Sequence, residues 1–182
     1  MCTLAVITKL GFVLRYVWHL LWNRRGLEMR GFVFLENDVT FRIQSGGRIL
    51  LEPRVYVKKG AVFECGSQGC IRVGRQAVIG NYVWIGCSQR IEIGAQTLLA
   101  HGATIFDVHH RHSRDTVLAE QDYTTGETII GSDVLVGTKA TIGGNVTVGR
   151  GCLIAEHSVV KSDLPEYVIA GGIPAKILKQ RQ

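Results

Sequence analysis

Three histidines, His109, His110 and His112, stand close together in a polar stretch of this 182-residue chain, with Asp107 and Asp115 on either side of them. A neutral imidazole can take a proton from a hydroxyl or an amine at neutral pH. A nearby carboxylate can orient that imidazole by accepting a hydrogen bond from its other nitrogen. Imidazoles are also common ligands of Zn²⁺. The cluster therefore indicates either a general base or a metal site.

An aliphatic residue followed by a small one recurs every six positions on both sides of this cluster, with a two-residue insertion between Ile85 and Ile93. The clearest copies are Val73-Gly74, Ile79-Gly80, Ile85-Gly86, Ile93-Gly94 and Leu99-Ala100, and then Ile130-Gly131, Val136-Gly137, Ile142-Gly143, Val148-Gly149 and Ile154-Ala155. Weaker copies begin at Leu51, Val57 and Phe63. A period of six matches neither an α-helix nor an ordinary alternating strand. It is typical of a solenoid.

The fifth position of each hexad is also small or aliphatic, as at Ala77, Val83, Thr97, Ala103, Val134, Ala140, Val146, Cys152 and Ser158. We expect the first and fifth residues to point inward, and the small second residue to relieve crowding. Three hexads close one triangular coil, and neighbouring coils stack at the strand spacing of ~4.8 Å. The sequence therefore predicts a mainly β fold, with a parallel β-helix of about five coils over residues 31–165.

The hexads are interrupted once, by an excursion loop over residues 106–129. A long irregular insertion in an otherwise regular domain usually has a function. Because this loop holds the histidine cluster, we expect it to carry the catalytic residues.

Composition excludes several classes of protein. Apolar residues make up 46% of the chain and charged residues 20%, which excludes a disordered protein. The net charge of +6 is mild and uneven, because residues 1–30 contribute +4 of it. That distribution favours an anionic surface at one end of the molecule over a nucleic-acid groove. The five scattered cysteines are typical of reduced thiols in a cytosolic protein.

The N-terminal segment, residues 1–30, combines these charges with an apolar run at residues 10–22. The run is shorter than the ~20 apolar residues that a membrane span needs, and no small-residue cleavage site follows it. Two interpretations of this apolar helix stay open. It packs over the first coil or on a neighbouring subunit, or it lies on an anionic bilayer with Trp18 and Trp22 at the headgroups. The second would place a cytoplasmic protein peripherally on the inner face of the cell membrane.

The hexads, the histidine loop and the C-terminal sequence together resemble the hexapeptide-repeat acyltransferase family. His112-Ser113-Arg114-Asp115 is similar to the His-Pro-Leu-Asp loop of maltose- and galactoside-type O-acetyltransferases. Residues 163–176 resemble the family's ending, with Pro174-Ala175-Lys176 intact and a departure at Ile173. The resemblance implies a left-handed β-helix, a short C-terminal helix within residues 166–182, and a homotrimer.

The activity that this resemblance implies is transfer of an acetyl group from acetyl-CoA to a hydroxyl or amino group of a sugar or glycan, as in polysaccharide biosynthesis. The acceptor attacks acetyl-CoA directly at a site between two subunits, and no metal is required. The loop histidine that matches the family is His112, which we expect to be the general base, followed by His110 and then His109. Asp107 or Asp115 is expected to orient the imidazole.

The coenzyme is expected to lie along the coils that follow the loop. The resemblance assigns to this groove the small residues that would leave room for the pantetheine arm, the lysines that would meet the phosphates and the Pro-Ala-Lys motif. These residues are Gly137, Lys139, Ala140, Ala155, Ser158, Lys161, Pro174, Ala175 and Lys176.

Two other functions stay open. A zinc lyase similar to the β-helical carbonic anhydrases would bind its ion through His101 and the loop histidines. Three loop histidines within four residues give poor tetrahedral geometry, however, and the C-terminal motif would have no role there. A non-catalytic assembly scaffold would use the solenoid without the histidines.

Overall fold

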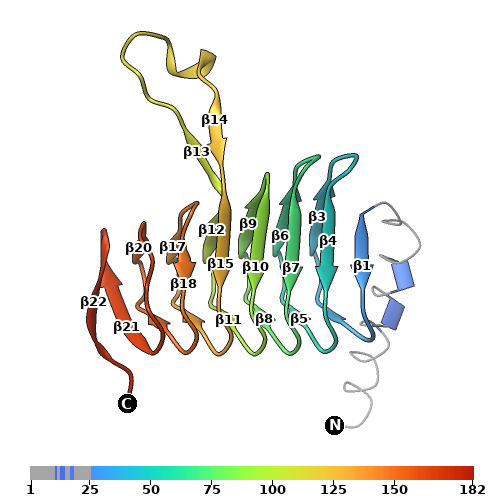
Figure 1. Cartoon of the computed structure of the whole chain (residues 1–182). Coiled ribbons are helices and arrows are strands. Elements are labelled where there is room, and N and C mark those ends of the chain that lie inside the picture. The colour runs from blue at the N-terminus through green and yellow to red at the C-terminus, as the bar shows by residue number, and fades with distance from the viewer. Residues whose placement is uncertain (1–10, 12, 15–16, 19–25) are drawn as a thin grey trace.

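The computed structural model describes residues 11, 13–14, 17–18 and 26–182. The chain winds in triangular coils, and each side of the triangle belongs to one parallel sheet (Figure 1). Sheet A contains β1 (Leu27–Met29), β4 (Arg48–Leu51), β7 (Cys70–Val73), β10 (Arg90–Ile93), β15 (Glu127–Ile130) and β18 (Thr147–Val148). Sheet B contains β2 (Phe34–Leu35), β5 (Tyr56–Val57), β8 (Val78–Ile79), β11 (Leu98–Leu99), β16 (Leu135–Val136), β19 (Leu153–Ile154), β21 (Val168–Gly172) and β22 (Ala175–Gln180). Sheet C contains β3 (Thr40–Ile43), β6 (Val62–Cys65), β9 (Trp84–Cys87), β12 (Thr104–Phe106), β17 (Thr141–Ile142) and β20 (Val159–Val160).

The hexad positions form the core, as predicted. The first and fifth residues of the hexads named above are at most 2% exposed, and the same holds for Leu51, Val57 and Phe63. In-register pairing places each apolar residue directly above its counterpart, as Ile71 lies between Ile49 and Ile91. The parallel β-helix is therefore confirmed. It has six strands in sheet A rather than about five coils, because it begins at Leu27, where the hexads are too degenerate to recognise.

The excursion is an antiparallel hairpin that projects from the corner between sheets C and A (Figure 1). It consists of β13 (Val108–His110) and β14 (Tyr123–Thr125), joined by a loop that contains the 3₁₀ turn η1 (Leu118–Glu120). Regular coils resume at Glu127.

The prediction of a short C-terminal helix is wrong. Residues 175–180 form β22, which pairs antiparallel with β21 at the end of sheet B. The last parallel strand of a solenoid exposes a row of unpaired backbone groups, and pairing with β22 satisfies them. Gly172, at φ 106°, lets the chain reverse between the two strands. Tertiary pairing at the open edge thus decides the conformation of this segment.

The expected N-terminal apolar helix falls largely outside the described residues and stays a prediction. The described positions 11, 13–14 and 17–18 have helical backbone, and β1 already belongs to the solenoid. Within the part of the chain that the structure describes, no helix combines the length and apolarity that a membrane crossing requires.

The outer faces of sheets A and B differ in chemistry. The outward row on sheet B is apolar in seven successive strands, and the register aligns its members. We call this the sheet B row: Phe34, Tyr56, Val78, Leu98, Leu135, Leu153 and Ile169. Sheet A instead carries ion pairs, such as Arg72–Glu52 at 3.2 Å and Arg90–Glu127 at 3.2 Å.

Candidate active site

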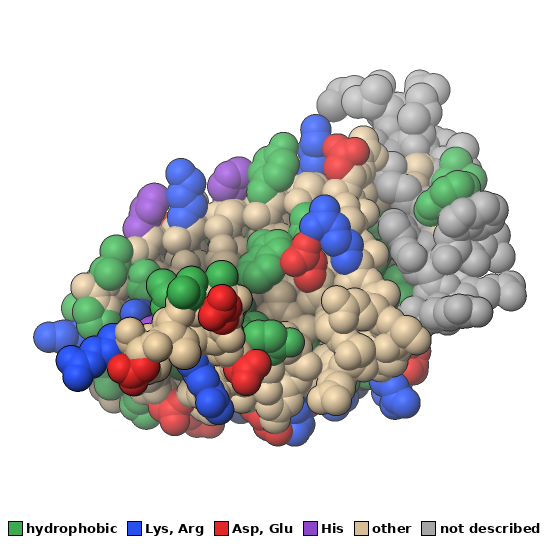
Figure 2. All heavy atoms as spheres, turned by 90° about the horizontal axis from the view of Figure 1, so that it is seen from above, with side chains coloured by type: hydrophobic (Ala, Val, Ile, Leu, Met, Phe, Trp, Pro, Cys, Tyr) green, Lys and Arg blue, Asp and Glu red, His purple; other side chains and the backbone are tan. Residues whose placement is uncertain are grey.

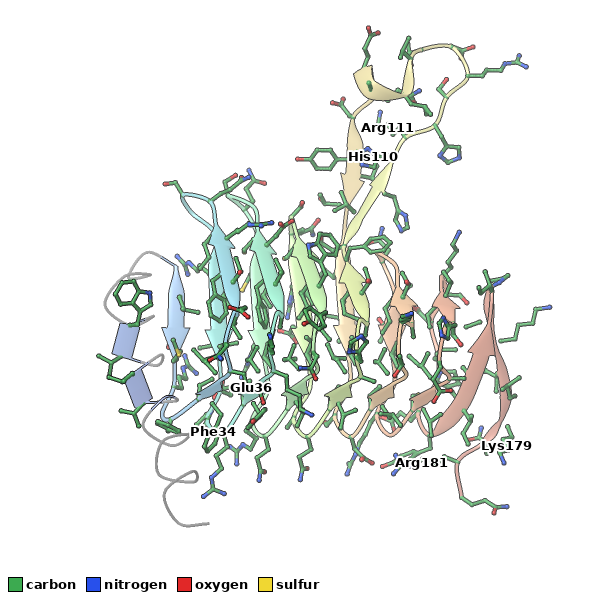
Figure 3. All side chains as sticks on the ribbon, turned by 180° about the vertical axis from the view of Figure 1, so that it is seen from behind. Phe34, Glu36, His110, Arg111, Lys179 and Arg181 are labelled. Carbon is green, nitrogen blue, oxygen red and sulfur yellow. The ribbon has the colours of Figure 1, made fainter. Side chains whose placement is uncertain are left out.

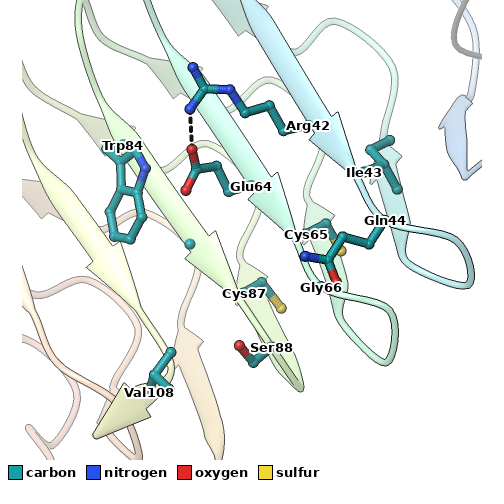
Figure 4. Close-up of a pocket in the computed structure, with 11 residues that line it drawn as sticks. Arg42, Ile43, Gln44, Glu64, Cys65, Gly66, Trp84, Cys87, Ser88 and Val108 are labelled. Carbon is teal, nitrogen blue, oxygen red and sulfur yellow. Dashed lines mark hydrogen bonds and ion pairs between the residues drawn. The ribbon is translucent and has the colours of Figure 1, made fainter. Parts of the chain in front are cut away.

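A groove of about 600 Å³ lies on the outer face of sheet C, at the root of the hairpin (Figure 4). Seen from the hairpin side, basic and acidic side chains stand around this hollow (Figure 2). It is lined by Arg42, Ile43, Gln44, Glu64, Cys65, Gly66, Trp84, Gly86, Cys87, Ser88 and Val108. Three successive strands supply the same positions, since Arg42, Glu64 and Gly86 are aligned in register. The groove is therefore a product of the repeat.

Two contacts shape the polar and aromatic sides of this groove. Arg42 donates a hydrogen bond to Glu64 and forms an ion pair with it across β3 and β6. The indole of Trp84 lies over Gly86, because a Cβ atom at Gly86 would stand 2.6 Å from its Cζ2 atom. Only glycine at this position leaves room for the ring to lie along the strand.

Asp107 is fully buried between the groove and the hairpin. Its Oδ2 atom accepts hydrogen bonds from the backbone N–H groups of Gln89 at 2.7 Å and Arg90 at 2.9 Å. The Ser88 N–H donates to Oδ1 at 2.8 Å, and the Cys87 thiol donates to Oδ2 at 3.3 Å. Asp107 was one of two carboxylates expected to orient an imidazole or to shape a turn. The carboxylate instead fixes the corner before β10 against the hairpin root.

The thiol of Cys87 stays protonated at neutral pH. A hydrogen bond with Cys65, burial and the negative charge of Asp107 all raise the pKa of Cys87. A protonated, buried thiol is a poor nucleophile. Within the described residues, Cys65, Cys70, Cys87 and Cys152 are free thiols.

The hairpin has two faces, and its histidines are divided between them. Val108 pairs with Thr125 and His110 with Tyr123, so these four side chains share one face. This face is turned toward the groove, because Val108 lines it. The Thr125 hydroxyl also donates to Gln89 on that side, at 2.9 Å. His110 makes an edge contact with Tyr123, with ring centroids 6.2 Å apart.

Tyr123 also lines a second hollow of about 400 Å³, which shares Gln44, Gly66 and Ser88 with the groove. Figure 3 shows His110 and Arg111 on the hairpin, above the body of the solenoid.

His109 lies on the opposite face of the hairpin, toward the later coils. Its Nε2 atom is 3.0 Å from the carbonyl oxygen of Gly144, and its ring meets Phe106 edge-on at 6.2 Å. A carbonyl oxygen only accepts hydrogen bonds, so Nε2 carries the proton and Nδ1 holds the free lone pair. Gly144 lets the backbone at the hairpin root lie close to it, because a Cβ atom there would be 2.8 Å from the carbonyl carbon of Asp107. The imidazole is thus held in one tautomer, with Nδ1 unprotonated.

His112 lies in the exposed loop beyond β13, where its Nδ1 atom is 3.4 Å from the carbonyl oxygen of His110. The Asp115 carboxylate accepts a hydrogen bond from the Ser113 hydroxyl at 3.0 Å and so shapes the turn. Across residues 26–182, no hydrogen bond joins Asp115 or Asp107 to an imidazole. The structure therefore separates the predicted base from both predicted orienting carboxylates.

The residues expected to bind the coenzyme fall into two groups. Gly137, Ala140, Ser158 and Ala175 are buried. Ala140 is a core residue, and the Ser158 hydroxyl accepts a hydrogen bond from the Gly172 N–H at 3.1 Å, so neither side chain can line an outer groove of this chain.

Ala155 is half-buried beside β21, where its N–H donates to the Ala170 carbonyl at 2.9 Å. The exposed members of the set are Lys139, Lys161, Pro174 and Lys176.

A zinc site within one chain finds no support in the described residues, which contain no group of three His, Cys, Asp or Glu side chains placed to hold an ion. His101 lies at the corner between sheets B and C and packs edge-on against Tyr82, with ring centroids 5.5 Å apart.

The groove residues Arg42, Glu64 and Trp84 were missed from the sequence. The sequence feature that could have revealed them is a regular spacing and not a local motif. Positions 42, 64 and 86 are 22 residues apart and face outward in register. Reading the outward positions of successive coils side by side would have brought a tryptophan and an ion pair together.

Comparison with known proteins supports the resemblance. Residues 127–162 match the family described as bacterial transferase hexapeptide (six repeats). A probable acetyltransferase of Mycobacterium tuberculosis (strain ATCC 25618 / H37Rv) is 36% identical over 116 residues, which are 63% of this chain and 39% of that protein. WbbJ of Escherichia coli (strain K12), a candidate lipopolysaccharide biosynthesis O-acetyl transferase, is 30% identical over 63% of this chain and 62% of its own length. The chain thus spans less than two thirds of either relative.

The hexapeptide-repeat acetyltransferase VCA0836 of Vibrio cholerae, solved in complex with acetyl coenzyme A, has a similar fold. Its TM-score is 0.66 at 26% sequence identity, over 74% of this chain and 71% of that one. The similarity to hexapeptide-repeat acetyltransferases that the motifs indicated is therefore confirmed in sequence and in fold.

Proposed function

We propose, from this likeness to hexapeptide-repeat acetyltransferases, that the chain transfers an acetyl group from acetyl-CoA to a hydroxyl or amino group of a sugar or glycan acceptor. The observation that carries the proposal is the histidine hairpin at the boundary between two different surfaces. On one side lies the groove of sheet C, and on the other lie the coils that match the hexapeptide family. The named functions of WbbJ and VCA0836 support a glycan acceptor and an acetyl-CoA donor.

The thioester is already activated, so the protein needs to remove the acceptor proton and hold the two reactants together. The acceptor hydroxyl gives its proton to an imidazole nitrogen as its oxygen attacks the thioester carbonyl. The tetrahedral intermediate then collapses, the C–S bond breaks, and the coenzyme thiolate takes the proton back from the imidazolium. No covalent enzyme intermediate and no metal are part of this route.

We assign the base to one of two hairpin histidines, of which His109 has the better fixed ring. Its ring is fixed by the Gly144 carbonyl with Nδ1 free, which is how an oriented general base is held in other enzymes. His110 is the alternative on the groove side of the hairpin. His112, which matches the family loop, stays a prediction that the same variants test.

The coenzyme phosphates are proposed to meet Lys139, Lys161 and Lys176, which are exposed on the coils and strands that follow the hairpin. An ammonium on a flexible stem suits a mobile phosphate.

The sheet B row supports the proposed homotrimer. A continuous apolar row along one face of a monomer is usually covered by a partner, whereas scattered apolar residues need no explanation. Cyclic assembly would bury this row and leave the ion pairs of sheet A in water. Light scattering of the purified protein tests the proposal, and a stable, active monomer of about 20 kDa would refute it.

The proposed activity is tested by incubating the purified chain with acetyl-CoA and a panel of methyl glycosides and amino sugars. Mass spectrometry of the products should show acetylated acceptor and free CoA in equal amounts. If acetyl-CoA neither binds nor is consumed with any acceptor, the proposed function is wrong.

A further inference from the structure

The side chain of Trp84 is the largest apolar surface in the groove. It projects outward from β9, in register with Val62 and Thr104 on the neighbouring coils, and it is half-buried. Because it lies down over Gly86, it offers a ring face and not only an edge to an occupant. The face of an aromatic ring is electron-rich, so it attracts C–H groups that carry partial positive charge. The C–H face of a pyranose ring has this character.

The ion pair of Arg42 and Glu64 supplies complementary polar groups beside the indole (Figure 4). The guanidinium only donates hydrogen bonds and the carboxylate only accepts them. Each hydroxyl of a sugar does both, so two adjacent hydroxyls match the pair. The pair carries no net charge, and the nearby Gln44 and Ser88 are neutral, so the groove does not favour a phosphate or a carboxylate.

The far end of the groove leads to the reacting groups. Val108 closes that end, and it shares a hairpin face with His110 and precedes His109. A ring whose hydroxyl pair rests on Arg42 and Glu64 would therefore point its opposite edge at the hairpin face that carries His110, whereas His109 lies on the other face.

We propose that this groove binds a neutral pyranose ring, with its C–H face on Trp84 and two adjacent hydroxyls on Arg42 and Glu64. This rests on the proposed function for the identity of the reaction, but the binding itself does not require turnover. Trp84, Arg42 and Glu64 then select the acceptor, and Gly86 is the positioning residue that lets the indole lie flat.

The first test measures binding without chemistry. Saturation-transfer NMR with methyl β-D-glucopyranoside should show the strongest transfer to the ring protons of one face. That transfer should disappear in Trp84→Ala and persist in Trp84→Phe, which keeps an aromatic face. Gly86→Ala should weaken it, because the added methyl group displaces the indole. Equal transfer in the wild type and Trp84→Ala would overturn the proposal.

The second test uses kinetics. Trp84→Ala and Arg42→Gln should each raise the acceptor KM about tenfold or more while the acetyl-CoA KM stays unchanged. Arg72→Gln is the matched control, because Arg72 forms a similar cross-coil ion pair with Glu52 on sheet A. If Arg72→Gln and Arg42→Gln have the same effect, the proposal is wrong. Arg42→Gln, which leaves the apolar side of the groove intact, keeps the test decisive should Trp84→Ala fold poorly.

The two ideas fail in distinguishable ways. If glycoside binding depends on Trp84 but no acetyl transfer occurs, the groove proposal is supported and the proposed function is wrong. Acetyl transfer to sugars with an acceptor KM that is unchanged in Trp84→Ala keeps the function and removes this inference.

Discussion

The coils before the hairpin and the coils after it are built to different lengths. Equivalent residues of β3, β6 and β9 are 22 apart, whereas Ile142 of β17 and Val160 of β20 are 18 apart, which is three hexads. The four additional residues lengthen the strands of sheets C and A from two residues to four, as a comparison of β3 and β4 with β17 and β18 shows.

These extra residues make the groove. Aligned on their inward residues, Phe41 corresponds to Ile142, so Arg42 and Ile43 have no counterpart in the later coils. Repeated through β6 and β9, the same extension supplies most of the groove lining. The match to the hexapeptide family covers residues 127–162, which is the regular half. The regular half therefore carries the match to the hexapeptide family, and the lengthened half carries the groove.

The hairpin lies between the halves, so changing its base should have the largest effect on catalysis. His109→Ala should lower kcat by about 10² to 10⁴, the usual loss for a general base. The acetyl-CoA KM should stay the same, and steady-state rates of CoA release measure both. His110→Ala and His112→Ala are the matched variants.

His109→Gln separates catalysis from positioning, because its amide N–H can still donate to the Gly144 carbonyl but cannot act as a base. Recovery of activity in His109→Gln, or full activity in His109→Ala, would mean that His109 is not the base and that His110 or His112 is.

The next largest effect should come from Asp107, which fixes the lengthened half against the hairpin. Asp107→Asn replaces a buried acceptor of several N–H groups with an amide whose N–H₂ opposes some of them. The free energy of unfolding should fall by about 2–4 kcal/mol, as seen in chemical denaturation. Asp163→Asn is the control, since the exposed Asp163 accepts one backbone N–H, from Thr147, at 2.7 Å. Equal losses in the two variants would contradict the role given to Asp107.

A smaller effect should appear when the regular half is changed. Lys161→Gln should raise the acetyl-CoA KM by roughly threefold to tenfold and leave the acceptor KM unchanged, because one charge-assisted contact to a phosphate is lost. Arg42→Gln should show the reverse pattern. A rise in the acceptor KM with Lys161→Gln would contradict the proposal that the regular half binds acetyl-CoA and the lengthened half binds the acceptor.

The smallest effect should concern the N-terminal segment and leave both halves intact. Five basic residues and one acidic residue give residues 1–30 their +4 charge, and each basic residue near an anionic bilayer contributes about 1 kcal/mol. We expect the full chain to co-sediment with anionic liposomes and to be released by high salt. A chain that begins at Gly26 keeps β1 and should stay in solution with unchanged kcat. Equal sedimentation of the two proteins would leave the membrane proposal without support.

Much of the fold could be predicted from the sequence, because inward positions have simple rules. The inward positions of a hexad tolerate few residue types, so the burial of Ile79, Val136 and Ile154 can be predicted from their residue types and spacing. Outward positions obey no such rule, and Trp84 becomes informative only when the coil length that places it beside Arg42 and Glu64 is known. The histidine cluster was visible, but its division between two faces depends on the hairpin register.

Asp107 and the C-terminal strand show a second limit of prediction from sequence, which is that tertiary contacts decide their roles. An aspartate beside histidines is ambiguous in sequence, and only the buried backbone donors at residues 88–90 decide its role. Residues 175–180 became a strand because an open sheet edge was available, which no local pattern could reveal.

Strand β22 also covers the open edge of sheet B. A parallel solenoid is a template that any further coil, from the same chain or another, can extend at its last strand. By running in the opposite direction along β21, β22 covers this edge in sheet B and presents the ammonium groups of Lys176 and Lys179 on the added strand. Removal of residues 175–182 would leave β21 as a growing end, and the protein would be expected to polymerise end to end as its concentration rises.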